Sequence, residues 1–288
     1  MYYITVLLLA LALLPLGIGV FISMRIFNIP DITTDGSYTL GAAVTAVLLM
    51  NGESPYLVLP CSIGAGMLAG MTTGFIHAKL KVDALLSGIL VMTALYSVNI
   101  SVMGRSNIPL IKTNTLFNLS GLLGDEKLSL LGVLMIIVFL IWSFMSWLMK
   151  TDFGLAMRAT GNNITMARAV GVNTSRMKIT GLAIANGCVA LSGSLVAQLQ
   201  GFADISMGIG IIIAGLGAVM IGEALLKSLK IYSITFRLLG VIIGSIIFRF
   251  VLAFVLQTGI DPNLLKLFTA IIVLIVVAIP ALSKKANN

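Results

Sequence analysis

The sequence predicts an all-α, polytopic helical membrane protein with about 8–10 transmembrane helices and a cytoplasmic coupling helix. Hydrophobic residues make up 59% of the chain and charged residues only 10%, whereas a soluble domain carries about 25% charged residues. The mean hydropathy is +1.10. Apolar runs of about 20 residues, the length that a helix needs to cross a bilayer, recur along the chain. We therefore expect a multi-pass protein of the cell membrane.

Nine apolar runs are candidate spans. The first has no positively charged start and no small-residue cleavage site, so we expect a retained helix rather than a signal peptide. The second is short and follows polar residues, which suggests a broken or re-entrant element. The runs are residues 4–24, 36–50, 56–78, 84–103, 129–149, 179–200, 206–226, 238–257 and 264–282.

Polar residues cluster just before the second run, in the stretch 29–46, which reads IPDITTDGSYTLGAAVTA. We expect Asp35, Gly36 and Ser37 to turn the chain and cap a helix that begins near Tyr38. The stretch is either an ordinary interhelical loop or a broken element that lines a substrate pathway. Polar residues elsewhere in the spans either line such a pathway or tie helices together. The candidate pathway residues are Asp31, Asp35, Ser37, Asn99, Asn186 and Gln198.

Glycines at regular spacings predict close helix packing, because lipid gives apolar helices no hydrophobic reason to associate. Membrane helices are rich in glycine in general, so each motif alone is weak evidence. The segment 206–226 has glycines on two faces, and we expect it near the centre of the bundle. The packing glycines are Gly66, Gly70 and Gly74, then Gly208, Gly215 and Gly222, with Gly240 and Gly244 in a further pair.

Lysine and arginine positions predict the orientation. If each run is crossed once and the 150–178 loop is cytoplasmic, thirteen of the eighteen basic residues lie inside. The amino terminus is then outside, or inside if 29–50 forms two elements. The thirteen are Arg25, Lys79, Lys81, Lys150, Arg158, Arg168, Arg176, Lys178, Lys227, Lys230, Arg237, Lys284 and Lys285; Arg105, Lys112, Lys127 and Lys266 lie outside, and Arg249 lies within a span.

The 151–178 stretch is polar and basic in an otherwise apolar chain. Asn162 or Asn163 can cap a short helix through ITMARAV, and Gly171 is a plausible stop. Ile164, Ala167 and Gly171 then share one face. The helix either lies on anionic lipid or docks a separate cytoplasmic protein.

Enzymatic chemistry has little support in the sequence. It lacks a phosphate-binding loop ending in Gly-Lys-Ser/Thr, and its one histidine, His77, sits near the end of a span. Cys61 and Cys188 lie in apolar runs without metal-like spacing. The basic residues are too dispersed to indicate nucleic-acid binding. Arg249 is expected to snorkel or to pair inside the membrane. No catalytic residue, metal site or cofactor is predicted.

The segment 161–201 reads GNNITMARAVGVNTSRMKITGLAIANGCVALSGSLVAQLQG. It resembles the signature region of permease subunits of ABC importers of the branched-chain amino acid and ribose type. The segment 207–226 resembles that family's next helix, although Gly222-Glu223 stands where the family usually has Gly-Gly. The segment 29–43 is similar to a subgroup labelled as tryptophan/tyrosine or uncharacterised permeases. The matching positions are Gly161, Asn163, Ala167, Arg168, Gly171, Lys178, Ser192, Gly193 and Ala197.

The resemblance implies one transmembrane permease domain over 1–288, paired with a second permease subunit, with a homodimer favoured. A separate cytoplasmic ABC ATPase drives transport, and an extracytoplasmic substrate-binding protein delivers a small solute. The chain itself is then not an enzyme. An amino acid, with aromatic ones suggested by the subgroup, is the expected substrate, and nucleosides or sugars stay open. The ATPase-coupling residues are Arg158, Gly161, Asn163, Ala167, Arg168, Gly171, Arg176 and Lys178.

Two other functions remain as alternatives. A stand-alone secondary transporter or channel would favour inverted repeats or a paired intramembrane ion site, and neither is evident in the sequence. An intramembrane enzyme would need a nucleophile with its base, or a set of metal ligands. Transport by this chain alone, driven by an ion gradient, would favour the first alternative.

Overall fold

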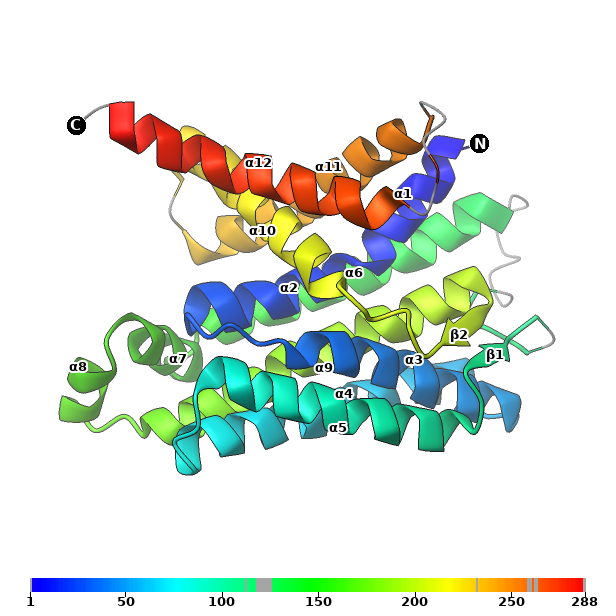
Figure 1. Cartoon of the computed structure of the whole chain (residues 1–288), viewed down its shortest axis with the longest axis horizontal. Helices are drawn as coiled ribbons and strands as arrows, with labels where there is room; N and C mark the ends of the chain where they lie inside the picture. Colours follow the sequence, from blue (N-terminus) through cyan, green and yellow to red (C-terminus); the bar gives the residue numbers. More distant parts are fainter. Residues whose placement is uncertain are drawn as a thin grey trace.

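The protein is built from helices that lie side by side in a bundle (Figure 1). The computed structural model describes residues 2–111, 113–117, 126–231, 233–257, 261 and 264–286. Its elements are α1 (Tyr2–Ala12), α2 (Leu14–Phe21), η1 (Ile22–Ile26), α3 (Thr33–Met50), α4 (Pro55–Lys79), α5 (Ala84–Met103), β1 (Asn107–Pro109), α6 (Glu126–Lys150), α7 (Asp152–Asn162), α8 (Ile164–Ala169), α9 (Thr174–Gln200), β2 (Phe202–Asp204), α10 (Ile211–Ser228), α11 (Ile234–Gln257) and α12 (Leu265–Ala286).

Seven of the described helical segments are long and apolar enough to cross a membrane, which confirms the predicted all-α membrane fold. The two other predicted runs fall on α3 and α12. α3 is almost entirely buried by its neighbours, so it does not need an apolar surface toward lipid. α12 carries a shorter apolar helix over Leu265–Val276.

The first span is one continuous crossing with two irregularities. Pro15 lies in the first turn of α2, where its missing N–H costs nothing, and it separates α1 from α2. The span ends in η1, a turn of π-helix over Ile22–Ile26. Such turns are rare, and they occur often where a helix carries functional residues.

The expectation that Asp35, Gly36 and Ser37 turn the chain was wrong, because α3 begins earlier, at Thr33. The Asp31 carboxylate accepts the Thr33 N–H at 3.0 Å, and the Thr34 hydroxyl donates to the Asp31 carbonyl. The start of the helix is thus capped by Asp31. Residues 27–32 run without regular helix from the end of η1 into the bundle, where α3 begins (Figure 1).

α10 also begins inside the bundle, after the chain has left β2 (Figure 1). The predicted helix 206–226 was therefore placed five residues too early, and Gly208 lies in the turn before α10. Discontinuous helices of this kind bring their N-terminal ends to the middle of the membrane, as in several classes of transporter.

The central helix is α9, not the 206–226 segment as expected. In its most apolar 18-residue window 83% of the residues are buried, compared with 39% for α10. α9 packs against α2, α3 and α4. Small residues are spread around the whole helix, so neighbours approach it from every side. α10 packs chiefly against α11, α12 and α2.

Glycines allow the closest helix contacts. A Cβ atom at Gly66, Gly70 or Gly74 of α4 would meet the backbone of α9. At Gly222 of α10 a Cβ would overlap the backbone of Gly240 in α11. Gly215 faces the side chain of Val20 and Gly244 the backbone of Ala218. Apart from Gly215, these glycines therefore lie directly against the backbone of a neighbouring helix.

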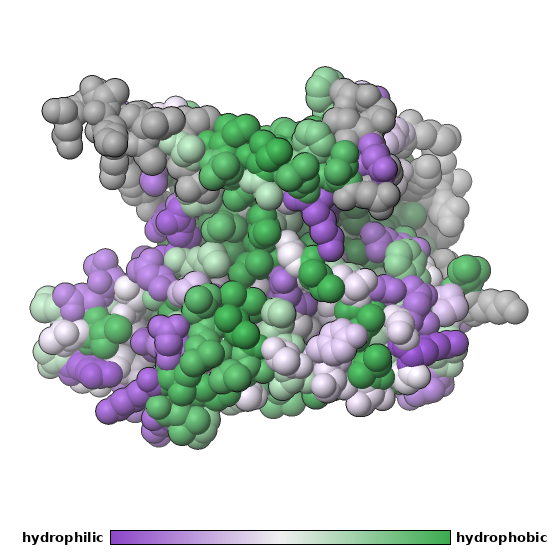
Figure 2. All heavy atoms as spheres, viewed as in Figure 1, coloured by the Kyte–Doolittle hydropathy of each residue, from purple (hydrophilic) through white to green (hydrophobic). Residues whose placement is uncertain are grey.

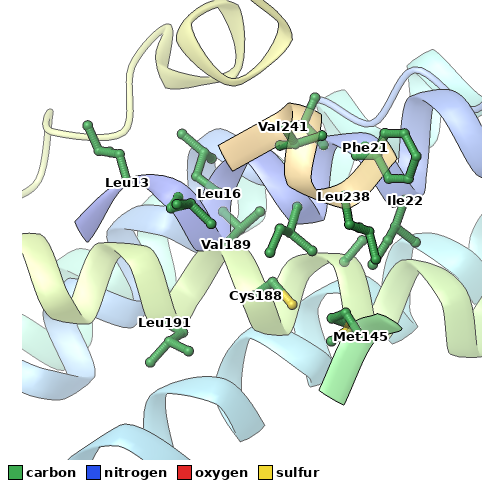
Figure 3. Close-up of a cluster of buried hydrophobic side chains, with 14 of the residues drawn as sticks. Leu13, Leu16, Phe21, Ile22, Met145, Cys188, Val189, Leu191, Leu238 and Val241 are labelled. Carbon is green, nitrogen blue, oxygen red and sulfur yellow. The ribbon is translucent and has the colours of Figure 1, made fainter. Parts of the chain in front are cut away.

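The largest hydrophobic cluster joins the first span to α6, α9 and α11 (Figure 3). Leu16 and Phe21 of α2 meet Val189 of α9 and Val241 of α11 within this cluster. Cys188 is buried there as a free thiol, and Cys61 is exposed and free. The cluster therefore holds the first span against α9 and α11. These two helices pack in turn against the discontinuous helices, α9 against α3 and α11 against α10.

A short antiparallel pair of strands, β1 and β2, lies at the end of the bundle opposite α7 and α8 (Figure 1). Ile108 pairs with Ala203, and both are buried. Ser206 donates both its hydroxyl and its N–H to the Asp204 carboxylate. These bonds, with Asn107 as a further donor, hold the pKa of Asp204 below its ordinary value.

Basic residues gather at the α7–α8 end. Arg25, Lys79, Lys150 and Lys227 all lie at or near the ends of helices on this side, whereas the amino terminus lies at the opposite end (Figure 1). Lys112 of the predicted outer group lies outside the described residues. The predicted orientation places these four residues on the same side of the membrane as the 150–178 loop, and in the structure they lie at the same end of the bundle as that loop.

Candidate functional site

Polar side chains of α4, α9 and the start of α3 form a buried cluster around Asp31, which is itself fully buried. Besides capping α3, its carboxylate accepts a hydrogen bond from Asn186 Nδ2 of α9 at 2.7 Å. Thr33 bonds Thr73 of α4 through their hydroxyl groups at 2.7 Å. Asp31 thus joins the start of α3 to the central helix, and Thr33 joins it to α4.

Asp35 connects the two discontinuous helices. Its carboxylate accepts the N–H of Gly210 at 2.8 Å and the N–H of Ile212 at 3.0 Å. These are free donors at the start of α10, where the helix dipole also favours a negative charge. Gly208 lies against the Asp35 backbone, with no room for a side chain. A residue of α3 therefore caps α10.

Four predicted pathway residues carry buried polar atoms that have no hydrogen-bond partner among the described residues. They are Ser37 Oγ, Asn99 Oδ1, Asn186 Oδ1 and Gln198 Nε2. Asn99 also donates to the Gly36 carbonyl at 3.2 Å, and Gln198 accepts from the Leu116 N–H at 3.0 Å. Gln198 lies three turns from Asn186 on α9 and is not part of the Asp31 cluster. Buried polar atoms without partners are costly, so these positions are suited to contact water or solute.

Replacing Asp35 by alanine should lower the free energy of unfolding by about 1 kcal/mol, the usual cost of losing a helix cap. Hydrogen exchange should become faster at the amides of Gly210 and Ile212, which lose their acceptor. Mass spectrometry of the protein in detergent would measure both effects. Asp83→Ala is the matched control, because Asp83 caps α5; it should leave these two amides unchanged. Unchanged exchange in Asp35→Ala would contradict the cap.

The predicted coupling segment forms two helices, α7 and α8. Asn163 caps α8 by accepting the Met166 N–H at 3.0 Å. Gly171, in the left-handed conformation with φ +85°, reverses the chain just after the helix. Gly161 packs against the backbone of η1, where a Cβ would overlap Ile26. These contacts fix α8 at the tip of the α7–α8 end.

Ile164 and Ala167, which the sequence predicts on one face of α8, differ in exposure. Ala167 is 2% exposed and packs inward, whereas Met166 is 66% and Val170 76% exposed. Ile164 is 38% exposed. A six-residue helix has too few turns for its buried face to be identified from periodicity. The exposed apolar group of Ile164, Met166 and Val170 is called the α8 tip below.

The basic residues of the segment lie in three places. Arg158 lines a cavity of about 410 Å³ with Arg25 and Arg237. Arg168 donates through Nε to the Thr174 hydroxyl at 2.9 Å, and Lys178 lies 3.1 Å from His77. Arg176 is exposed on the first turn of α9.

A buried charge triad was missed by the sequence analysis. Glu223 of α10 is paired with Arg25 of η1 at 2.8 Å and with Arg237 of α11 at 2.7 Å. The Arg237 guanidinium also lies 5.2 Å from the ring centre of Phe21. The signal was present, since Glu223 is a lone acid at the end of an apolar run.

Arg249 of α11 was expected to snorkel or to pair. It lines a small pocket with Leu16, Gly215 and Ser245, and within the described chain its guanidinium has no hydrogen bond or ion pair. No group of three His, Cys, Asp or Glu residues that could hold a metal occurs among the described residues.

The family described as "Branched-chain amino acid transport system / permease component" matches residues 2–278. The tyrosine transport system permease protein of Clostridioides difficile (strain R20291) is 39% identical over 275 residues, which cover 94% of this chain and 90% of that protein. The galactofuranose transporter permease protein YtfT of Escherichia coli (strain K12) is 27% identical over 256 residues, with 86% of this chain and 71% of that protein covered.

A solved structure has the same fold. It is described as a metal-chelate type ABC transporter in an inward-facing conformation, and it superposes with a TM-score of 0.52. The match covers 98% of this chain and 85% of that chain at 13% sequence identity. At this identity the likeness concerns the fold alone.

The family match, the relatives and the seven spans agree with one another. Together they show a multi-pass protein of the plasma membrane that serves transport, and the family implies an ATPase and a substrate-binding protein as partners. The chain belongs to the branched-chain amino acid transport system / permease component family, and it is a membrane-spanning permease subunit of an ABC importer.

Proposed function

We propose that this permease translocates an aromatic amino acid, that α7 and α8 face the cytoplasm and dock the ATPase, and that two copies of the chain form the pathway. The β1–β2 end then faces the substrate-binding protein. The substrate class is supported by the 39% identical relative named as a tyrosine transport system permease. The relative named for galactofuranose is more distant, at 27%.

The observation that carries the docking role is the α8 tip. Met166 and Val170 are exposed although they are apolar. α8 lies beyond the ends of the spans (Figure 1) and carries Arg168, and Arg176 follows on the first turn of α9. Large apolar side chains held on a rigid, capped helix are typical anchors for a partner groove. The surrounding cations fit an acidic rim on that partner.

Coupling is supported by the contacts behind the tip. α7 packs on η1 through Gly161, and Asn28 donates to the Gly161 carbonyl at 3.1 Å. η1 is followed directly by the segment that leads to Asp31 and α3. A displacement of α8 would therefore be transmitted through α7 and η1 to the start of α3. We assign Arg158, Asn163, Ala167, Gly171 and Lys178 to positioning of this unit.

Replacing both Met166 and Val170 by aspartate should weaken binding of the partner ATPase at least tenfold, because two apolar anchors are lost. Transport of labelled tyrosine into proteoliposomes that contain the permease, the ATPase and the substrate-binding protein should fall in parallel. Surface plasmon resonance and uptake assays measure the two quantities.

Leu229→Asp is the matched control, since Leu229 is 65% exposed in the turn that follows α10, at the same end of the bundle. It should retain ATPase binding. Equal loss in the control, or normal transport by the double variant, would overturn the docking role. Uptake of tyrosine by the permease without any ATPase would overturn the proposed mechanism as a whole.

A further inference from the structure

A second basic cavity, of about 340 Å³, lies on the α7–α8 side, where α4 ends and α5 and α9 begin. It is called the α4–α9 cavity. Its charged lining is mostly positive, with Lys81, Arg168 and Lys178, and Asp83 is the acid among its lining residues. The Asp83 carboxylate is engaged in capping α5 through the N–H groups of Leu85 and Leu86. The cavity therefore presents three cations and one occupied acid.

The cationic groups are held in place by neutral partners. Lysine can only donate, so the Lys178–His77 contact makes His77 Nε2 the acceptor. His77 Nδ1 then carries the proton and donates to the Val82 carbonyl at 3.0 Å. Arg168 is oriented by its bond from Nε to Thr174. Within the described chain its terminal nitrogens form no hydrogen bond, and they stay available to a ligand.

An exposed apolar surface adjoins the α4–α9 cavity. Phe75 is 51%, Leu80 61% and Leu86 50% exposed, and all three lie within a few residues of the turn that lines the cavity. In Figure 2 hydrophilic residues meet a hydrophobic patch at the ends of α4 and α5 on this side. A ligand that fits both features has an anionic group joined to long apolar chains.

We propose that the α4–α9 cavity binds the phosphate of an anionic phospholipid of the inner leaflet, whose acyl chains lie along α4 and α5. The cavity lies at the level where the span α4 ends and the span α9 begins, which is the depth of lipid headgroups. Basic pockets between membrane helices on the cytoplasmic side are suited to such headgroups. The inference rests on the proposed orientation, and it assigns the lipid a place behind the coupling unit.

An acidic side chain of the ATPase is the competing occupant, because Arg168 and Lys178 belong to the coupling segment. The exposed side chains of Leu80 and Leu86 favour lipid. Acyl chains would cover these apolar side chains, whereas an acidic loop in water would not. The lipid can also be tested on the permease alone, so its absence is distinguishable from failure of ATPase docking.

The experiment is native mass spectrometry of the purified full-length permease in detergent with added phosphatidylglycerol or phosphatidylcholine. Phosphatidylglycerol should be retained at one saturable site, and phosphatidylcholine should bind far more weakly. Lys81→Gln should weaken phosphatidylglycerol binding about fivefold, the effect of one lysine beside an anionic headgroup. Lys81 lies in the turn between α4 and α5, outside the proposed coupling residues.

Lys230→Gln is the matched control. Lys230, like Lys81, is an exposed lysine with positive φ in a turn at the same end of the bundle, but it does not line the cavity. It should leave lipid retention unchanged. Equal loss in the two variants would overturn the proposal, as would full displacement of the lipid by millimolar inorganic phosphate. Lys81→Gln that weakens ATPase binding but not lipid binding would assign the cavity to the protein partner instead.

Discussion

Replacing Glu223 by alanine should destabilise the permease by about 2–3 kcal/mol. Glu223 is the only carboxylate paired with Arg25 and Arg237 among the described residues, and its own side chain is 7% exposed. Removing one partner of a fully buried pair costs about 3–5 kcal/mol, because the other charge is left without compensation. The two arginine side chains are 30% and 36% exposed, so water offsets part of this cost.

Thermal unfolding in detergent measures the effect. Glu53→Ala is the control, since Glu53 lies exposed in the turn between α3 and α4, and its replacement should change stability by less than about 0.5 kcal/mol. Hydrogen exchange should also rise in η1, which Glu223 ties to α10. Wild-type stability in Glu223→Ala would show that the triad adds nothing to the fold.

Replacing Gly41 by alanine should destabilise the permease by about 1–3 kcal/mol, the usual range for overpacking a closely packed core. A Cβ at Gly41 would overlap the backbone of Ala190 in α9. Backbone atoms cannot rotate away, so α3 and α9 must separate. Since α3 also carries Asp31 and Asp35, transport should fall with stability.

Gly64→Ala is the matched control for this substitution. Gly64 is also a helical glycine, but a Cβ there would meet no atom within 4 Å. Alanine is the better helix former by about 1 kcal/mol, so this variant should be as stable as the parent or more so. Thermal unfolding of both variants provides the comparison. Equal melting temperatures for the two would contradict the close α3–α9 contact.

The spans could be predicted because lipid imposes one requirement on every residue of an exposed helix. The polar contacts could not, because they join residues far apart in the sequence. Asn186 bonds Asp31 across 155 positions, and the Gly210 N–H bonds Asp35 across 175. The local pattern identified Asp35 as a helix cap, but it assigned this cap to the helix expected to begin near Tyr38. The structure gives that role in α3 to Asp31 and leaves Asp35 to cap α10.

The coupling segment shows where local signals suffice. The cap at Asn163 depends on one side chain and one amide three residues later, so sequence identifies it. The outward face of α8 depends on what lies behind the helix, which is α7 and the start of α9. The same holds for the charge triad, in which Glu223 and Arg25 are 198 positions apart but bond at 2.8 Å.

The burial of α9 has a consequence for how the protein is made. This helix carries Asn186, Ser192, Ser194 and Gln198, all buried, and hydrocarbon would be a poor first environment for them. Its main neighbours, α2, α3 and α4, all precede it in the chain. During synthesis the helices that surround α9 therefore enter the bilayer before α9 does. Moving α9 ahead of α4 by circular permutation would remove that protection during synthesis.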